Sequence, residues 1–401
     1  MGSEAVGPAL AKRVHIPGLD GIRGLAIGLV LISHSVIYDE FSHVRSIGLS
    51  AGYAGVSIFF VLSGYLITTL ILREEDRTGS ISLGLFYLRR ALRLFPALWL
   101  YLVVVGVIWI AGGLPHHPWH SFVSSLLYTR NLVGRGHETS HLWSLSIEEQ
   151  FYLLWPLVLV GLPRRDRTRL LVALGSLIGI TLWRIYAART GLASAGALYM
   201  RSDFRFDSPL FGCVLAMARR VAPRTVTWSN STPLRSGLLA VVGVFGLSAW
   251  VGMRLGEVVY PGTDATVVSL IGVVLVLSQV GVQSRVSDWF ACVPLVALGQ
   301  ISYGVYLWQQ LFLGPRTPGF ESIRTFPMGL LATFAVALTS YWCLERPLLQ
   351  LKDRRFHKSD VGGDSSTPEQ GQQRTPNSAH PKLSPSNHAW YPVVAPNKSS
   401  A

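Results

Sequence analysis

Residues 93–111 read RLFPALWLYLVVVGVIWIA, a run that is apolar over nearly its whole length. Two similar runs, residues 237–251 and 332–344, carry no charged side chain at all. A helix needs about 20 mostly apolar residues to cross the hydrocarbon core of a bilayer. Several runs of this kind in one chain exclude a soluble globular fold and predict an integral membrane protein.

The composition agrees with this prediction. Of the 401 residues, 50% are hydrophobic and only 14% are charged, and the mean hydropathy is +0.38. An ordinary soluble domain has about 25% charged residues. The net charge of +13 could indicate a nucleic-acid partner. Most of the arginines, however, lie in short loops between apolar runs, which is typical of cytoplasmic loops, so we expect a lipid bilayer and no nucleic acid as the partner.

The apolar runs predict an all-α fold: an integral membrane bundle of about ten transmembrane helices, with both termini cytoplasmic. Arginine-rich and arginine-poor loops alternate along the chain, and this alternation requires an even number of crossings. The first helix lacks a small-residue cleavage site after it, so we expect a retained anchor and not a signal peptide. The predicted helices are 19–38, 56–72, 93–111, 143–162, 169–187, 208–221, 236–253, 265–282, 291–313 and 328–345.

Three segments are predicted from the change in composition along the chain. Residues 1–14 form a cytoplasmic N-terminal segment, and residues 15–350 form the transmembrane domain. Residues 351–401 are rich in Pro, Ser, Asn, Gln and Lys. Such a composition buries too little apolar surface to offset the entropy of ordering, so we expect a disordered cytoplasmic tail. No internal repeat is visible, although transporters often contain one.

The first predicted helix contains two ionisable residues, Arg23 near its cytoplasmic end and His34 deeper in. Eleven residues are about three helical turns, so the two side chains share nearly one face and lie about 16 Å apart along the axis. Ionisable groups inside a membrane are costly and often functional. A histidine can act as a general base. It can equally make an interhelical hydrogen bond without chemistry, and position alone leaves both interpretations open.

A basic cluster opens the third predicted helix. Arg89, Arg90 and Arg93 are three and four residues apart, so their guanidinium groups gather on one helical face. Taken alone, the cluster is explained by topology and by contact with lipid headgroups. The alternative is a clamp for the phosphates of an anionic cofactor, to which forked guanidinium groups are suited.

Residues 141–156 read HLWSLSIEEQFYLLWP and begin another predicted helix. Ser144, Glu148, Tyr152 and Trp155 follow one another at helical spacing and share one face. The aromatic residues alone could form an interfacial belt. Two adjacent glutamates at the start of a spanning helix are harder to explain, although the N-terminus of a helix does favour carboxylates.

Weaker signals lie elsewhere. Arg205 and Asp207 flank Phe206 and could form a structural ion pair. His116, His117 and His120 have the spacing of metal ligands, but no carboxylate or cysteine accompanies them, which favours a solvated loop. The predicted helix 291–313 carries several polar groups: Tyr303, Tyr306, Trp308, Gln309 and Gln310. Each of the three cysteines falls in an apolar segment, which argues against disulfides and against a thiolate metal site. No Walker loop, nucleophile elbow or His-Glu-x-x-His motif is present.

Taken together and in chain order, these segments resemble the acyltransferase family 3 of multi-pass membrane proteins. The resemblance covers about residues 15–350. It rests on residues 18–23 (GLDGIR) followed by His34, 55–67 (GVSIFFVLSGYLI), the 89–96 arginine cluster with Pro96, 141–156, 205–207 (RFD), 302–308 (SYGVYLW) and 345–347 (ERP). One departure is Gln309, where many relatives have histidine.

The resemblance implies an O-acyltransferase of the inner (plasma) membrane. It would move an acyl group, often acetyl, from acyl-CoA to a hydroxyl of a sugar, glycan or secondary metabolite. His34 would be the catalytic base and Arg23 its signature partner, while Glu148 would orient His34 or bind acceptor hydroxyls. Arg89, Arg90 and Arg93 would hold the CoA phosphates. Acyl-CoA is then a donor substrate, and we expect no permanently bound cofactor and no metal. We expect the substrates also to contact Trp143, Tyr152, Arg205, Asp207, Tyr303, Trp308 and Gln309.

Two other classes of protein remain open from the residues alone. A transporter of a lipid-linked or small polar substrate would also place polar groups inside the membrane, but it would move its substrate without consuming acyl-CoA. A non-catalytic scaffold or sensor would explain the arginines and the aromatic residues. It would not explain why His34 is aligned with Arg23.

Overall fold

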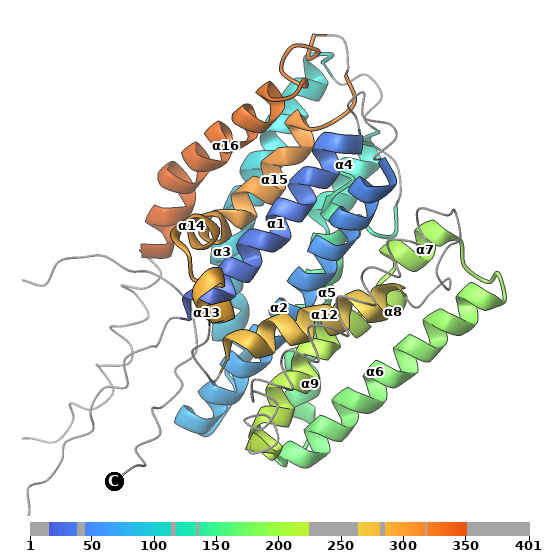
Figure 1. Ribbon diagram of the computed structural model, residues 1–401, viewed down its shortest axis with the longest axis vertical. Coiled ribbons are helices and arrows are strands. Elements are labelled where there is room, and N and C mark those ends of the chain that lie inside the picture. The colour runs from blue at the N-terminus through green and yellow to red at the C-terminus, as the bar shows by residue number, and fades with distance from the viewer. Residues whose placement is uncertain are drawn as a thin grey trace, which may run out of the picture.

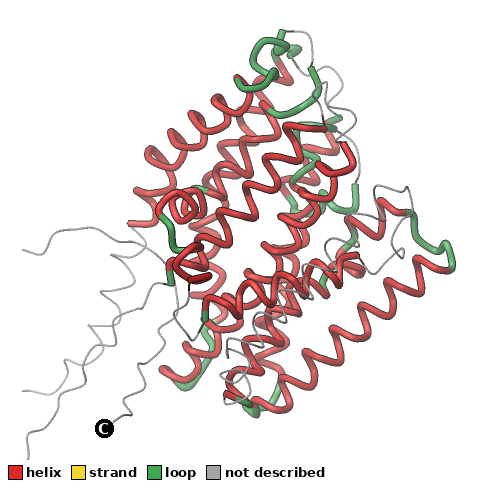
Figure 2. Tube along the Cα trace, in the orientation of Figure 1, coloured by secondary structure: helices red, strands yellow, loops and turns green. Residues whose placement is uncertain are grey.

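The computed structural model describes residues 16–37, 45–113, 118–133, 136–223, 264–280, 285–316 and 319–350, and within these ranges the chain is helical with no strand (Figures 1 and 2). In chain order the helices are α1 (Pro17–Ile37), α2 (Arg45–Thr78), α3 (Leu83–Ile110), α4 (Trp119–Leu126), α5 (Leu142–Gly161), α6 (Asp166–Arg189), α7 (Ala195–Met200), α8 (Ser202–Arg205), α9 (Asp207–Val221), α12 (Asp264–Gln279), α13 (Arg285–Phe290), α14 (Val293–Gln300), α15 (Ser302–Phe312), α16 (Met328–Ser340) and the π-helix η2 (Tyr341–Glu345). The all-α prediction is confirmed for this part of the chain.

Within the described ranges, four helical segments are long and apolar enough to cross a membrane: Ala51–Thr78 in α2, α3, α6, and Met328–Gln350, which includes α16. The apolar helix α12 is shorter. Four is fewer than the ten predicted spans, partly because α9, α12 and α15 have only 15, 16 and 11 residues. Predicted helix 236–253 and the segments 1–14 and 351–401 lie outside the described residues, so the full count, the cytoplasmic termini and the disordered tail stay predictions.

Two predicted helices are interrupted in the structure. The range 291–313 is divided into α14 and α15, with Ile301 between them, and the range 328–345 changes from α16 into η2. Hydropathy alone does not reveal these interruptions, because each one lies within a range that is apolar over most of its length. The short helices α4, α7, α8 and α13 were not predicted, since none of them is long enough to form an apolar run of spanning length.

Helix α2 lies at the centre and contacts α1, α9, α12 and α5. Glycines make its close contact with α9 possible. A Cβ added at Gly64 would lie 1.9 Å from the carbonyl oxygen of Pro209, and one at Gly212 would lie 2.0 Å from the carbonyl oxygen of Val61. Lipid chains are as apolar as the side chains, so small residues that let backbones approach are a main source of helix association in membranes. These reciprocal glycines hold α2 and α9 in contact.

Replacing Gly64 with alanine is therefore expected to lower the unfolding temperature of the detergent-solubilised protein. The added methyl group meets main-chain atoms and not a flexible side chain, so the helices must separate, at a cost of about 1–3 kcal/mol. Gly175 in α6 is the matched control, because a Cβ there meets nothing within 4 Å. Equal melting of Gly64→Ala and Gly175→Ala would contradict this account of the α2–α9 contact.

Helices α3, α6 and α16 expose apolar side chains on their outer surfaces. Val103, Val107, Leu171, Leu182 and Leu331 are each about three-fifths exposed. Figure 1 shows α16 and α6 on opposite sides of the molecule. Apolar exposure on such long helices fits a surface that faces lipid.

A buried ion pair joins α6 to α9. The Arg184 guanidinium donates to the Asp207 carboxylate at 2.5 Å, and the two side chains are 1% and 0% exposed. Arg184 also donates to the Phe204 carbonyl at 2.9 Å and to the Thr266 hydroxyl at 2.6 Å. The sequence analysis considered Arg205 as the partner of Asp207. The structure gives this role to Arg184, because α6 packs on α9 and α8.

Arg184→Leu is expected to destabilise the protein by about 3–5 kcal/mol, since it leaves the Asp207 carboxylate buried without a countercharge. The double variant Arg184→Leu/Asp207→Leu removes both charges and is expected to recover much of the loss. The measurement is thermal unfolding in detergent. If the double variant melts as low as the single one, the pair acts through packing and not through charge.

Candidate active site

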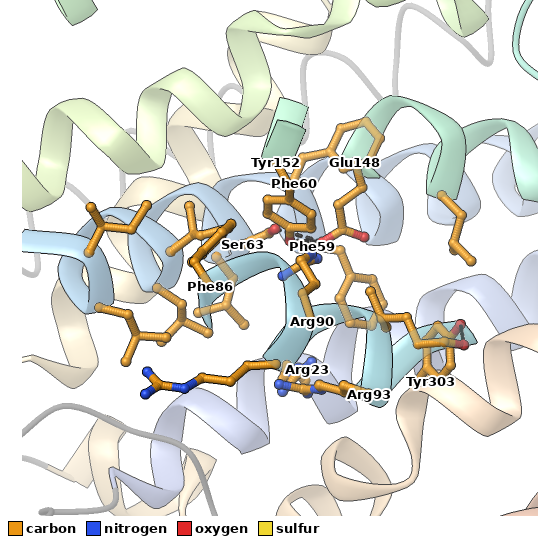
Figure 3. Close-up of a pocket in the computed structure, with 18 of the residues that line it drawn as sticks. Arg23, Phe59, Phe60, Ser63, Phe86, Arg90, Arg93, Glu148, Tyr152 and Tyr303 are labelled. Carbon is orange, nitrogen blue, oxygen red and sulfur yellow. Dashed lines mark hydrogen bonds between the residues drawn. The ribbon is translucent and has the colours of Figure 1, made fainter. Parts of the chain in front are cut away.

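A cavity of about 530 Å³ opens among α1, α2, α3, α5 and α15 (Figure 3). Its walls combine an apolar surface from α2, including Phe59, Phe60 and Leu66, with a strongly basic rim and floor. The arginines that line it are Arg23, Arg73, Arg77, Arg89, Arg90 and Arg93, and the carboxylates are Glu74 and Glu148. The size and the mixed lining are those of a small-molecule site, and the excess of arginines favours an anionic ligand.

Glu148 is held in the cavity wall by two hydroxyl groups. The Ser63 hydroxyl donates to Glu148 Oε1 at 2.6 Å, and the Tyr152 hydroxyl donates to the same oxygen. Ser63 comes from α2, whereas Glu148 and Tyr152 are one turn apart on α5, as their spacing predicted. Since both bonds fall on Oε1, the second carboxylate oxygen has no partner in the described part of the chain. Glu148 is thus a fixed acceptor with one oxygen available to a ligand.

Arg90 is already engaged by the protein. Its guanidinium donates to Glu149 at 3.2 Å and stacks over the ring of Tyr152. Arg89 lies 3.7 Å from Glu74. The sequence grouped Arg89, Arg90 and Arg93, and all three line the cavity. Their contacts differ: Arg90 links α3 to α5 through Glu149, and Arg89 lies beside Glu74 of α2.

Arg93 has different surroundings. Within the described residues it makes no hydrogen bond and no ion pair, and it lies near the like charges of Arg23 and Arg90 as well as near Asp20. Figure 3 shows Arg93 and Arg23 beside each other at the floor of the cavity. Arg23 itself is 4.0 Å from Asp20. With Arg93 near Arg23, the floor of the cavity carries two cations near one carboxylate, which favours an anionic ligand.

His34 does not line this cavity. It lies near the other end of α1, partly buried, and its Nδ1 is 2.9 Å from the Val30 carbonyl oxygen. A carbonyl only accepts, so Nδ1 carries the proton and Nε2 keeps a free lone pair. This tautomer is the one that a general base needs. The structure thus places Arg23 with the other arginines and not in contact with His34.

The remaining predicted residues are divided between the cavity and the core. Tyr152 and Tyr303 line the cavity, and the Tyr303 hydroxyl donates to the Leu94 carbonyl at 2.8 Å. Trp143 packs on Phe60 and Tyr199, with ring centroids 6.4 and 4.5 Å apart.

Arg205 and Gln309 do not line the cavity either. Arg205 is fully buried and donates to the hydroxyls of Tyr53 and Ser57 at 2.6 and 2.8 Å. Gln309 is also fully buried, with Trp308 beside it in α15. Asp207 belongs to the ion pair with Arg184. These three polar residues therefore lie behind the cavity walls.

Some cavity residues were not predicted to belong to a site. Ser63 was only part of the 55–67 motif, and Ser144 and Tyr306 were named for their positions on their helices without a role in a site. Arg73 and Arg77 lie on the cytoplasmic end of α2 according to the predicted topology. Their basic character was visible, but it was explained by topology alone. Only the fold, which brings α2 and α3 to the same cavity, shows that they share it with Arg89.

No group of three or more potential metal ligands occurs among the described residues. His116 and His117 lie outside those residues, so the sequence prediction for the histidine-rich loop is not tested.

The described part of the chain is helical, with apolar helices long enough to cross a membrane and a cavity lined by arginines. The comparisons with known proteins assign its class. The chain belongs to the acyltransferase-domain family, which it matches over residues 16–346. This match confirms the resemblance to the membrane acyltransferases.

Individual relatives are annotated with related activities. The chain is 30% identical to the peptidoglycan O-acetyltransferase OatA of Listeria monocytogenes over 84% of the chain and 56% of that protein. It is 28% identical to the O-acetyltransferase OatA of Staphylococcus aureus over 83% of the chain and 57% of that protein. The chain therefore spans about half the length of the curated relatives it matches. No solved structure gives a significant match.

Proposed function

We propose that the protein is a membrane-embedded O-acyltransferase that moves an acetyl group from acetyl-CoA to a hydroxyl of a glycan. The observation that carries the proposal is the excess of arginines around one cavity, which six arginines and only two carboxylates line. Acetyl-CoA is a polyanion whose phosphates suit guanidinium groups. Family membership and the names of the relatives support acyl transfer and a glycan as the acceptor.

In this proposal the arginines have separate tasks. Arg23 and Arg93 hold an anionic part of the donor inside the cavity. Arg89 contributes at the rim, and Arg90 positions α3 through Glu149 and Tyr152. The free Glu148 oxygen accepts a hydrogen bond from an N–H or O–H of the substrate. Arg23 thus acts on the donor, and its fixed spacing from His34 sets the distance between the donor anchor and the base.

His34 is the proposed general base. Its Nε2 takes the proton of the acceptor hydroxyl while the hydroxyl oxygen attacks the thioester carbonyl. The new C–O bond forms, the C–S bond breaks, and the CoA thiolate receives the proton from His34. Because His34 lies about 16 Å along α1 from Arg23, the donor enters from the cytoplasm and the acceptor approaches from the outer side. The arginine distribution supports this orientation, and the resemblance to the membrane acyltransferases supports the plasma membrane as the location.

The test uses membranes of the native host and acetyl-CoA labelled in the acetyl group. Overexpression of the protein is expected to increase alkali-labile label in the glycan fraction, because O-acetyl esters hydrolyse in mild base. The competing function, transport of a lipid-linked or small polar substrate, would instead give substrate flux in vesicles without any consumption of acetyl-CoA. Flux without ester formation would overturn the proposed transfer.

A further inference from the structure

A group of buried polar atoms without partners lies beyond the donor cavity. It comprises both ring nitrogens of His141, both side-chain amide atoms of Gln309, Oε1 of Gln310 and Nε1 of Trp308. These four side chains are at most 3% exposed. A buried polar atom without a partner costs about 1–3 kcal/mol, and native proteins contain few of them. Four of the six atoms belong to residues 308–310 of α15, and two belong to His141, whose carbonyl accepts a hydrogen bond from Tyr306 of α15. A polar ligand would supply the partners that these atoms lack within the described part of the chain.

Aromatic rings surround the same place. The His141 ring lies 5.5 Å from that of Tyr101 and 5.4 Å from that of Tyr306, and the Trp308 ring is 5.4 Å from Tyr101. Tyr306 and Gln309 are three residues apart on α15, so they share a face of that helix. Aromatic walls with a few convergent polar groups are typical of sites for small organic ligands.

This polar cluster is separated from the donor cavity by a pair of hydroxyls. Ser144 and Tyr306 line the cavity, and their oxygen atoms are 2.5 Å apart. The Tyr306 hydroxyl also lies 2.7 Å from the His141 carbonyl oxygen, to which it donates. On the other side, the His141 ring is close enough to His34 for the two imidazoles to interact electrostatically. The cluster thus adjoins both the donor cavity and the proposed base.

We propose that His141, Gln309 and Gln310 bind the sugar hydroxyls of the acceptor, with the rings of Tyr101, Tyr306 and Trp308 forming the walls of the site. This inference rests on the proposed function and names the residues that recognise its acceptor. A sugar hydroxyl both donates and accepts hydrogen bonds. The amide of Gln309 offers one donor group and one acceptor atom, and His141 in either neutral tautomer offers the same. A hydroxyl bound here also lies next to His34, which takes its proton.

The test compares steady-state kinetics of the purified, detergent-solubilised full chain, with acetyl-CoA as the donor and muramidase-released peptidoglycan fragments as the soluble acceptor probe. Gln309→Leu and His141→Gln are each expected to raise the KM for the fragments by about tenfold, while the KM for acetyl-CoA stays within twofold. Gln309→His keeps a hydrogen-bond donor and acceptor and is expected to hold the fragment KM within threefold of wild type. Gln279→Leu is the matched control, since Gln279 is a buried glutamine on α12, beside Gly18 of α1.

The outcomes separate this inference from the function on which it rests. If the wild-type protein transfers no acetyl group to the fragments and none to native membranes, the proposed function fails. If the wild type transfers acetyl but the two variants change only the acetyl-CoA KM, or change the fragment KM no more than Gln279→Leu does, the acceptor site is elsewhere. If Gln309→Leu does not accumulate in membranes, His141→Gln and Gln309→His decide the question by the same criterion.

Discussion

Arg93→Gln is expected to weaken acetyl-CoA binding by about tenfold to a hundredfold. The variant removes a hydrogen bond between two charged groups, which contributes about 1.5–3 kcal/mol, and tenfold in affinity corresponds to about 1.4 kcal/mol. The same substitution is expected to leave the ligand-free protein at least as stable as the wild type. The reason is that Arg93 makes no hydrogen bond and no ion pair within the described residues and lies near the like charges of Arg23 and Arg90.

Thermal unfolding with and without acetyl-CoA measures both effects. A ligand that binds only the folded state raises its stability, so acetyl-CoA raises the melting temperature of the wild type and has little effect on Arg93→Gln. Arg90→Gln is the matched control, because its melting temperature without ligand is expected to change in the opposite direction. It breaks the contact with Glu149 and is expected to melt below the wild type without any ligand.

The idea of an anion-binding floor would be abandoned if Arg93→Gln lost stability without ligand and kept its full response to acetyl-CoA. That pattern would make Arg93 a structural residue like Arg90. The variant would then have removed a favourable countercharge of the Asp20 carboxylate.

His34→Ala is expected to reduce transfer of labelled acetyl by about a hundredfold to ten-thousandfold, the usual contribution of a general base. Acetyl-CoA binding should be unchanged, since His34 does not line the donor cavity and lies about 16 Å from Arg23 along α1. The measurement pairs the transfer assay in membranes with the acetyl-CoA-dependent melting shift of the purified protein, at matched expression.

His120→Ala is the control for this variant, because His120 lies on α4 and belongs to neither the cavity nor the polar cluster. It should behave as the wild type in both measurements. Transfer by His34→Ala at the wild-type rate would remove His34 from the chemistry. If acetyl-CoA binding were lost together with transfer, His34 would act on the structure of the donor site and not as a base.

Much of the fold was predictable because hydropathy reports helices directly. The ranges predicted for α1, α3, α5, α6 and α9 agree with the structure to within a few residues, apart from the start of α3 at Leu83. The break at Ile301 and the short helices were missed, since they depend on how the chain packs and not on apolar periodicity. The orientation of the bundle in the membrane remains a prediction from the arginine distribution.

The site was predictable by its residue types but not by its grouping. Helical spacing placed Glu148 and Tyr152 on one face, and the structure confirms their contact. Spacing also suggested that Arg89, Arg90 and Arg93 act together, whereas tertiary contacts give Arg90 to Glu149 and put Arg93 opposite Arg23. Arg23 comes from α1 and Arg93 from α3, and they meet only at the cavity. Residues so far apart in the chain leave no local pattern, and the same holds for Arg184 and Asp207.

The straight segment of α1 between Arg23 and His34 fixes both the distance between these two side chains and their relative direction around the helix. Deleting one residue from it would shorten the distance by only about 1.5 Å, but it would rotate His34 by about 100° relative to Arg23, away from the shared face. Substitutions in this segment that preserve its packing are tolerated better than insertions or deletions, which change its length. Over evolutionary time, substitutions should therefore accumulate between these two residues, while insertions and deletions should be eliminated.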